Sequence, residues 1–326
     1  MLENSDRQLI NRTWDQLWSS GITNPIVVSD LIGSVLLFGR VSDDRVWQEL
    51  LTAADHHDSS AVAETLSRIR RAHGIDAGSE FEDPRFWRNC HILSAAMESL
   101  DPLLHGGSGP PAGNALGYSD VLGDIYEHIL SKLATAGRFG QFRTPRHIVD
   151  FMVELAEPGA GELVVDPACG SGGFLVAASA YRRARGHSGS YHGIEIDRTI
   201  GRIATANLVF HDLGDAKVDI GDGLSSQNTG ADVILANPPF AGSVSDAVAA
   251  RFTIPTRKTE LLFVEAMMNQ LAPGGRAAVI VPLGVVNGLS TGALAIRRML
   301  VEDNNLTHVI ELPSGVFRPY SDVKTA

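Results

Sequence analysis

The chain has 326 residues, of which 44% are hydrophobic, and its formal net charge is −11 at pH 7. This length and apolar content are enough to bury a sizeable core, so we expect a globular protein of two domains. The excess of acidic side chains argues against strong nucleic-acid binding by this chain alone, because affinity for phosphates rests on clustered Lys and Arg.

The N-terminus and the cysteines argue against several further classes of protein. The start, MLENSDRQLI, lacks the basic patch and long apolar core of a signal peptide, and no apolar run approaches the roughly 18 residues that span a bilayer. We therefore expect a cytoplasmic protein without a membrane segment. Cys90 and Cys169 have no metal-ligand spacing, so the sequence predicts neither a disulfide framework nor a metal site.

Helical patterns dominate residues 1–105 and predict a helical N-terminal domain. This region holds all four tryptophans of the chain, Trp14, Trp18, Trp47 and Trp87. The first two have the i,i+4 spacing of one helix face, and we interpret all four as core anchors rather than as a base-stacking platform. Residues 106–117 are rich in Gly, Pro and Ser, which indicates a linker.

After the linker, the pattern changes to that of an α/β domain over residues 118–326. The run YSDVLGDIYEHILSKLATAG predicts a helix with Ser119 as its N-cap. From residue 162 onward, apolar strands alternate with helices, which predicts a mostly parallel sheet with helices on both faces.

A glycine-rich turn stands between a strand and a helix in ELVVDPACGSGGFLVAASAYRRA, residues 162–184. Gly170, Gly172 and Gly173 allow a ligand to approach the backbone, and the helix start offers free N–H groups. The turn is not a phosphate loop, and Leu175 stands where a dinucleotide fingerprint has its third glycine. Asp166 would repel a pyrophosphate but suits a ligand with cationic groups, such as S-adenosylmethionine.

Two further acids follow at the ends of the next strands. Glu195 ends the strand of YHGIEID, about 20 residues after the turn, where a carboxylate can accept hydrogen bonds from both ribose hydroxyls. Asp222 ends the strand of VDIGDGL and is well placed for an adenine amino group. Three acids in strand order therefore predict a nucleoside pocket along one edge of the sheet.

The run ADVILANPPFAG, residues 231–242, ends another buried strand. Pro238 and Pro239 cannot extend a sheet ladder because they donate no backbone N–H, so they predict a rigid turn. This turn would hold Asn237 and Phe240 at the carboxyl end of the strand, where open α/β sheets bind ligands. A basic run, RFTIPTRK at residues 251–258, follows close behind.

Together these motifs resemble a known family. The runs GQFRTPRHIVDFMVEL, DPACGSGGFL, GIEID, GDGL, NPPF and LPSGVFRPY stand in the order found in the M subunit of type I restriction-modification systems, which are N6-adenine DNA methyltransferases (EC 2.1.1.72). The resemblance covers about residues 118–326 and implies a class I S-adenosylmethionine-dependent methyltransferase domain with a Rossmann-like fold. It also implies double-stranded DNA, a specificity (S) subunit and a restriction (R) subunit as partners.

The same resemblance implies roles for individual residues. The S-adenosyl-L-methionine pocket would be lined by Phe142, Thr144, Pro145, Asp166, Ala168, Gly170, Gly172, Glu195, Asp222 and Asn237. The target-base pocket would be formed by Asn237, Pro238, Pro239 and Phe240. There, the Asn237 side-chain oxygen and the Pro238 carbonyl would accept the two N6 hydrogens of a flipped adenine while Phe240 stacks on its ring. Arg143 departs from the family pattern, which usually has a second aromatic there.

Alternatives to DNA methylation remain open at the level of the sequence. The same NPP turn can hold another planar amide or amine, such as an RNA base or a protein glutamine. In relatives, the segment corresponding to SDVKTA leads into a final apolar strand that inserts into the sheet, and this chain stops before that strand. We therefore expect either a truncated or split form of the catalytic domain or a domain that another chain completes. A non-catalytic S-adenosylmethionine-binding or assembly subunit is the alternative.

Overall fold

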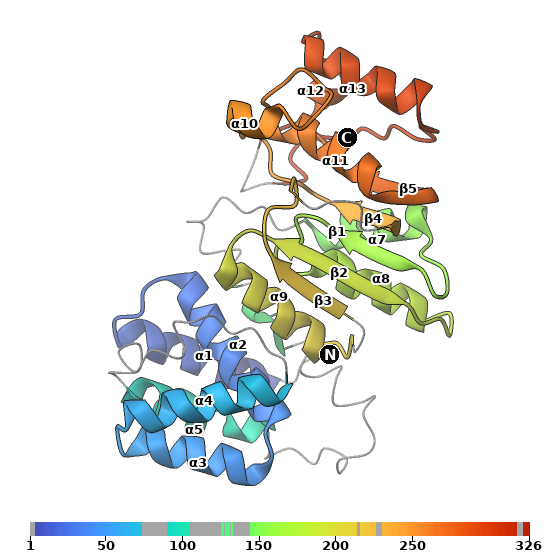
Figure 1. Ribbon diagram of the computed structural model, residues 1–326. Coiled ribbons are helices and arrows are strands. Elements are labelled where there is room, and N and C mark those ends of the chain that lie inside the picture. The colour runs from blue at the N-terminus through green and yellow to red at the C-terminus, as the bar shows by residue number, and fades with distance from the viewer. Residues whose placement is uncertain are drawn as a thin grey trace. The chain divides into compact units, whose positions relative to one another are not determined.

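The computed structural model describes residues 4–73, 90–104, 125–126, 128–130, 132, 144–213, 216–225, 230–317 and 322–326. Their contacts divide the chain into two compact units. The first combines residues 1–136 with 198–214, and the second combines residues 137–197 with 215–326 (Figure 1). The predicted linker at 106–117 lies outside the described residues, as does most of the helix predicted after it.

The first unit is helical. Its helices are α1 (Asn4–Ser19), α2 (Pro25–Val41), α3 (Asp44–Asp55), α4 (Ser59–His73), α5 (Cys90–Leu104) and α9 (Arg198–Phe210). Helix α2 begins at a proline directly after Asn24, whose side chain accepts a hydrogen bond from the Ile26 N–H, a strong start signal. Most of α2 is buried, so this helix runs through the centre of the unit.

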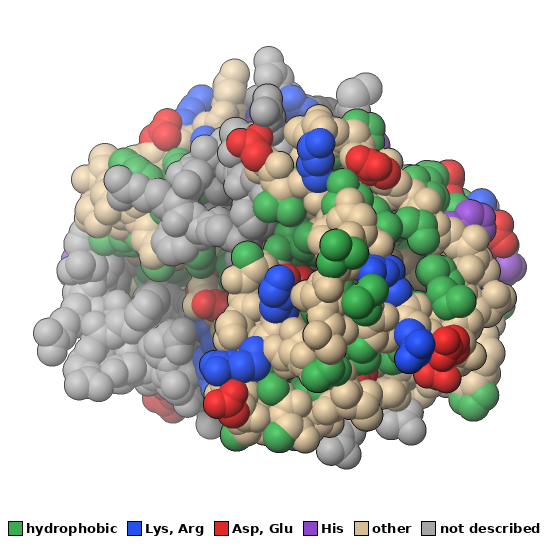
Figure 2. All heavy atoms as spheres, turned by 90° about the horizontal axis from the view of Figure 1, so that it is seen from above, with side chains coloured by type: hydrophobic (Ala, Val, Ile, Leu, Met, Phe, Trp, Pro, Cys, Tyr) green, Lys and Arg blue, Asp and Glu red, His purple; other side chains and the backbone are tan. Residues whose placement is uncertain are grey.

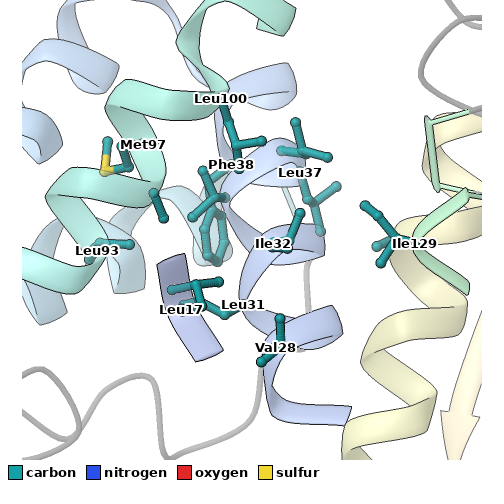
Figure 3. Close-up of a cluster of buried hydrophobic side chains, with 14 of the residues drawn as sticks. Leu17, Val28, Leu31, Ile32, Leu37, Phe38, Leu93, Met97, Leu100 and Ile129 are labelled. Carbon is teal, nitrogen blue, oxygen red and sulfur yellow. The ribbon is translucent and has the colours of Figure 1, made fainter. Parts of the chain in front are cut away.

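Apolar side chains from α1, α2 and α5 meet around that central helix. Figure 3 shows Leu17 of α1 and Leu93, Met97 and Leu100 of α5 beside the side chains of α2. The tryptophans fit this core only in part, because Trp14 and Trp47 are buried whereas Trp18 is 41% exposed. The prediction of a core role is therefore wrong for Trp18: helical spacing alone does not say how wide the buried stripe of a helix is. Trp87 lies outside the described residues.

Helix α9 belongs to the helical unit although its sequence lies between two strands of the other unit. The Arg202 guanidinium of α9 donates two hydrogen bonds to the Asp30 carboxylate of α2, at 3.1 and 2.6 Å, and both side chains are buried. The buried Tyr126 hydroxyl donates to the Ile203 carbonyl at 3.2 Å. A charged pair and a hydroxyl bond thus hold α9 against the N-terminal helices.

The second unit is built on a five-stranded sheet of β1 (Leu163–Asp166), β2 (Ser190–Glu195), β3 (Ala216–Ile220), β4 (Ala231–Ala236) and β5 (Leu271–Val279). The strands pair in the order β3-β2-β1-β4-β5, and every pairing is parallel. The helices of this unit are α7 (Arg146–Ala156), α8 (Gly173–Arg183), α10 (Asp246–Ala249), α11 (Thr259–Gln270), α12 (Leu283–Asn287) and α13 (Thr291–Glu302). This arrangement confirms the predicted α/β class.

Strand β4 is buried on both faces, as expected for the middle of a parallel sheet. Ile234 and Ala236 pack in one cluster with α11. Val233 and Leu235, which are also fully buried, alternate with them and so point to the opposite face, where α7 and α8 contact the strand. The continuous apolar run of β4 therefore confirms the prediction of helices on both faces.

The last described residues return to the sheet. Val281 and Ala326 exchange two backbone hydrogen bonds, at 2.8 and 2.9 Å, and Pro282 bridges Thr325 in antiparallel fashion. On the opposite side of this terminal segment, the Thr325 carbonyl accepts a hydrogen bond from the Leu312 N–H at 2.9 Å. Among the helices that the structure describes, none has the length and apolar character needed to cross a membrane.

Candidate functional site

The carboxyl ends of β1, β2 and β4 meet where the strand order changes direction. β1 pairs with β2 on one side and with β4 on the other, so the chain leaves β1 toward one edge of the sheet and later returns to the opposite side. In open α/β sheets, ligands bind in the crevice at the carboxyl ends of the strands beside this switch point. Asp166 ends β1, Glu195 ends β2, and Asn237 directly follows β4.

The glycine-rich turn after β1 has the backbone shape that requires glycine. Gly170 has φ +53° and Gly172 has φ +80°, both in the left-handed region. Gly172 is the N-cap of α8 and has no side chain with which to satisfy the first N–H groups of the helix. A Cβ at Gly170 or Gly173 would meet no atom within 4 Å, so open space lies beside the turn. The turn therefore combines room with free backbone donors.

Two buried carboxylates hold the turn against the ends of β1 and β2. The Asp166 Oδ1 atom accepts a hydrogen bond from the Ala168 N–H at 3.1 Å. The Glu195 carboxylate accepts hydrogen bonds from the Gly170 N–H at 3.0 Å and from the Asp197 N–H at 2.9 Å. Glu195 therefore connects the end of β2 to the turn after β1, in addition to any contact with a ligand.

Burial raises the pKa of both carboxyl groups. The pKa of Asp166 is raised to about 8, chiefly by burial and further by the nearby Glu195 charge, against the opposing effect of the Ala168 hydrogen bond. The pKa of Glu195 is also raised by burial, while its backbone hydrogen bonds act in the other direction. Two carboxylates with raised pKa values at one crevice are typical of a functional site, and a cationic ligand would favour their ionised forms.

Asp222 lies in the turn after β3. Its carboxylate accepts hydrogen bonds from the Leu224 N–H at 3.0 Å and from the Ser225 hydroxyl at 3.1 Å. The next residue, Gly223, packs so closely on the glycine-rich loop that a Cβ there would come within 1.9 Å of the Pro167 carbonyl oxygen. This packing fixes the Asp222 turn beside the β1 turn. Sequence motifs did not predict this contact of Gly223, and the GDGL run was the one signal that marked the position.

Asn237 is oriented by a residue far away in the sequence. Its Nδ2 group donates a hydrogen bond to the Thr144 hydroxyl oxygen at 3.0 Å. Its Oδ1 atom is buried and has no hydrogen-bond partner among the residues that the structure describes. Thr144 precedes Pro145, the N-cap of α7, so the start of that helix sets the position of the hydroxyl. The arrangement leaves one amide oxygen ready to accept a hydrogen bond from a ligand, because an unpaired buried acceptor is costly.

The structure brings together most of the residues predicted to form the site. At the carboxyl edge of the sheet lie Thr144, Pro145, Asp166, Ala168, Gly170, Gly172, Glu195, Asp222 and Asn237. In the turn that follows Asn237, Pro238 is buried, Phe240 is half-buried and Pro239 is exposed. Phe142 and Arg143 lie outside the described residues. The ligand contacts of all these residues stay predictions.

A family model supports the resemblance noted in the sequence. The model of the N-6 DNA Methylase family matches residues 117–326. The chain is also 36% identical over 222 residues to the methylase subunit of the type I restriction enzyme EcoEI from Escherichia coli, which covers 63% of this chain and 45% of that subunit. It is 31% identical over 223 residues to the methylase subunit of EcoKI from Escherichia coli K12, covering 61% of this chain and 42% of that subunit. The chain thus spans less than half the length of these relatives.

Solved structures have the same fold. A modification subunit of a type I restriction enzyme from Vibrio vulnificus matches 72% of this chain and 52% of its own, with a TM-score of 0.62 and 30% identity. A type I methyltransferase subunit from Streptococcus thermophilus matches 100% of this chain and 84% of its own, with a TM-score of 0.73 and 20% identity, which shows the fold. With its parallel sheet, its glycine-rich turn and a family model matched over residues 117–326, this chain belongs to the N-6 DNA methylase family.

Proposed function

We propose that this chain transfers a methyl group from S-adenosyl-L-methionine to N6 of adenine in DNA (EC 2.1.1.72), as the modification subunit of a type I restriction-modification system. The observation that carries the proposal is the buried Asn237 Oδ1 atom. It has no hydrogen-bond partner in the described part of the chain, and the bond from Asn237 to Thr144 holds it in place. The EcoEI and EcoKI methylase subunits, which this chain resembles, support the same assignment.

The residues at the glycine-rich turn fit S-adenosylmethionine. The open space beside Gly170 and Gly173 leaves room for a ligand against the backbone, and Asp166 and Glu195 offer carboxylates to its positive groups and ribose hydroxyls. When bound, this cofactor supplies a methyl group on a positively charged sulfur. Asp166 would hold the cofactor as a carboxylate, so binding would lower its pKa from about 8 and release a proton near neutral pH.

Asn237 and the turn after it would prepare the adenine amine for reaction. The N6 lone pair is delocalised into the ring, and inside a duplex the amine is paired and stacked, so the base must be flipped out. Two acceptors, the Asn237 Oδ1 atom and the Pro238 carbonyl, would take the two N6 hydrogens and favour a tetrahedral nitrogen. Phe240, which is half-buried, would stack on the ring, a contact worth about 1–3 kcal/mol at other base-stacking sites.

Partners would supply DNA recognition. A net charge of −11 does not favour tight DNA binding by this chain, so a specificity subunit would bring the DNA, and a restriction subunit would join the assembly. Lys324–Ala326 pair in antiparallel fashion with Val281–Leu283, directly after β5. Several apolar side chains of the second unit are exposed, including Leu306, Val309 and Ile310. Figure 2, which looks down on the side where α12 and α13 lie, shows hydrophobic side chains spread over this face.

Methyl transfer by two Thr144 variants and one Asn237 variant tests the proposal. Asn237 borders both proposed pockets, but its unpaired oxygen is assigned to the base, so Asn237→Ala should change S-adenosylmethionine affinity far less than the rate of transfer. The rate should fall by about 100- to 1,000-fold, the usual cost of one preorganised polar group. Thr144→Val removes the hydroxyl that orients Asn237, whereas Thr144→Ser keeps it. We therefore expect a slow valine variant and an active serine variant.

The measurement is transfer of labelled methyl groups into duplex DNA by the chain purified together with its bound partners. Digestion to nucleosides identifies the product, and calorimetry gives the cofactor affinity of each variant. N6-methyladenine from the wild type is the expected product. Label on another base, on RNA or on a protein glutamine would contradict the proposal, as would cofactor binding without any turnover in the complete complex.

A further inference from the structure

The basic run RFTIPTRK, residues 251–258, lies in the second unit and is hydrogen-bonded to the segment that follows Asn237. It contains three cations, Arg251, Arg257 and Lys258, and no acid, in a chain with 38 acidic and 27 basic residues. All three cationic side chains are exposed. The run connects α10 to α11, which lie beside each other in Figure 1.

Backbone hydrogen bonds attach this run to the turn that follows Asn237. The Val244 N–H donates to the Arg257 carbonyl at 2.9 Å, the Thr259 N–H donates to the Gly242 carbonyl at 3.1 Å, and Ser243 bridges Lys258 in antiparallel fashion. A Cβ on Gly242 would lie 2.6 Å from the Thr259 hydroxyl oxygen, so the two segments are in close contact. The run and the turn are thus joined by backbone hydrogen bonds and by close packing.

The spacing places Lys258 near any base held at the turn. Ser243 is three residues after Phe240, which limits their Cα separation to about 11 Å, and antiparallel partners lie about 5 Å apart. The Lys258 Cα atom is therefore within about 16 Å of the Phe240 Cα atom. Since phosphates along one strand of a duplex are spaced by about 3.4 Å, the phosphates within about five nucleotides of the target lie in this range.

A buried carboxylate holds the other end of the run. Glu265 of α11 is only 2% exposed, yet its carboxylate accepts three hydrogen bonds from the run. The donors are the Thr253 N–H at 2.7 Å, the Thr253 hydroxyl at 2.7 Å and the Ile254 N–H at 3.0 Å. Burying a carboxylate is costly unless it is well hydrogen-bonded, so this anchor fixes the path of the backbone between the two basic ends.

The three cations differ in how they are engaged. The Arg251 guanidinium donates to the Ser225 hydroxyl at 3.2 Å, which directs it toward the Asp222 turn. Arg257 pairs with Asp246 at 3.1 Å, but both groups are exposed, so this ion pair is weak and open to exchange. The Lys258 ammonium has no ion-pair or hydrogen-bond partner among the described residues, and its side chain does not cap α11 although the residue is the N-cap.

We propose that residues 251–258 form a phosphate-binding strip, in which Lys258, with Arg257 and Arg251 beside it, binds the DNA backbone flanking the target adenine. Glu265 is a positioning residue that holds the strip at the correct distance from the Asn237 turn. The inference rests on the proposed function, since it takes the substrate to be DNA. The strip would give this acidic chain a local contact with the DNA backbone. The specificity subunit would add further contacts with the DNA.

Salt dependence of DNA binding tests this strip. The probe is a fluorescently labelled duplex titrated with the chain and its co-purified partners between about 50 and 200 mM salt. Lys258→Ala should weaken binding by about fivefold near 0.1 M salt, equally for specific and unrelated sequences. It should also make the slope of log affinity against log salt shallower by about 0.9, the value for one lost phosphate contact.

The control is Lys217→Ala, which removes the same charge from β3, the strand at the opposite edge of the sheet from β5. We expect this variant to retain the wild-type slope. Glu265→Gln replaces one acceptor with a donor that faces backbone N–H groups, so it should weaken DNA binding and shift the slope toward that of Lys258→Ala while cofactor affinity holds. Since the salt slope reports charge contacts, a merely structural defect would not move it in this way.

The outcomes separate this inference from the function on which it rests. If the wild type makes N6-methyladenine but Lys258→Ala keeps the wild-type affinity and slope, the strip is wrong and the proposed function stands. If the wild-type complex makes no N6-methyladenine, the proposed function itself fails. If Glu265→Gln fails to fold, Lys258→Ala still tests the strip, because the Lys258 side chain makes no cap hydrogen bond to α11 that its removal would break.

Discussion

Asp166 should make the stability of the second unit fall as pH rises toward neutrality. Its carboxyl group is 1% exposed, and its pKa in the folded chain is about 8 against an ordinary value of 3.8. Between these two pH values, the folded chain holds a proton on Asp166 that the unfolded chain has lost. Stability therefore falls with rising pH by about 1.4 kcal/mol per unit, is unaffected below pH 4, and carries the full penalty above pH 8.

The variant Asp166→Asn removes this titration while keeping the local contact, because an amide oxygen can still accept the bond from the Ala168 N–H. Between pH 5 and 7, the wild type should lose about 3 kcal/mol of stability that the variant retains. Asp150→Asn is the matched control, since Asp150 is exposed and its ion pair is with the exposed Arg146 on the same helix. Its stability should follow the wild type at every pH.

Urea denaturation followed by circular dichroism, without cofactor, measures the effect. Tryptophan fluorescence would not, because all four tryptophans lie between residues 14 and 87, in the N-terminal part of the chain. The reasoning is refuted if the stability curves of the wild type and Asp166→Asn run parallel from pH 5 to 7. Parallel curves would mean that Asp166 is ionised in the folded chain despite its burial.

Two further predictions concern packing. Gly223→Ala should lower stability by about 1–3 kcal/mol, because the new Cβ would meet the Pro167 carbonyl oxygen. Gly221→Ala should not lower it, because a Cβ there meets nothing within 4 Å. Thermal melts that show an equal loss of stability in both variants would rule out this cause. Arg202→Ala should cost about 3–5 kcal/mol in the helical unit, because it removes the guanidinium that pairs with the buried Asp30 carboxylate. Tryptophan fluorescence during urea unfolding would detect this loss, and an unchanged midpoint would show that the pair contributes nothing.

Local sequence determined the framework of the site. The apolar run before Asn237, the glycines after Asp166 and the two prolines each act within a few residues, through backbone geometry that only those residue types allow. For this reason the strands, the turn and the parallel sheet could be predicted, and with them the strand ends at which Asp166, Glu195 and Asn237 lie. The family resemblance added the candidate chemistry of these positions.

Tertiary structure alone decided which distant groups meet. No local pattern relates Thr144 to Asn237, 93 residues apart, and none predicts that Glu265 anchors the basic run or that Gly223 packs on Pro167. Helix α9 shows the same limit, since its packing on the N-terminal helices depends on the pairing of Arg202 with Asp30, 172 residues away. Spacing along the chain sets local conformation, but contacts between remote side chains depend on how the folded elements pack, which only the whole molecule determines.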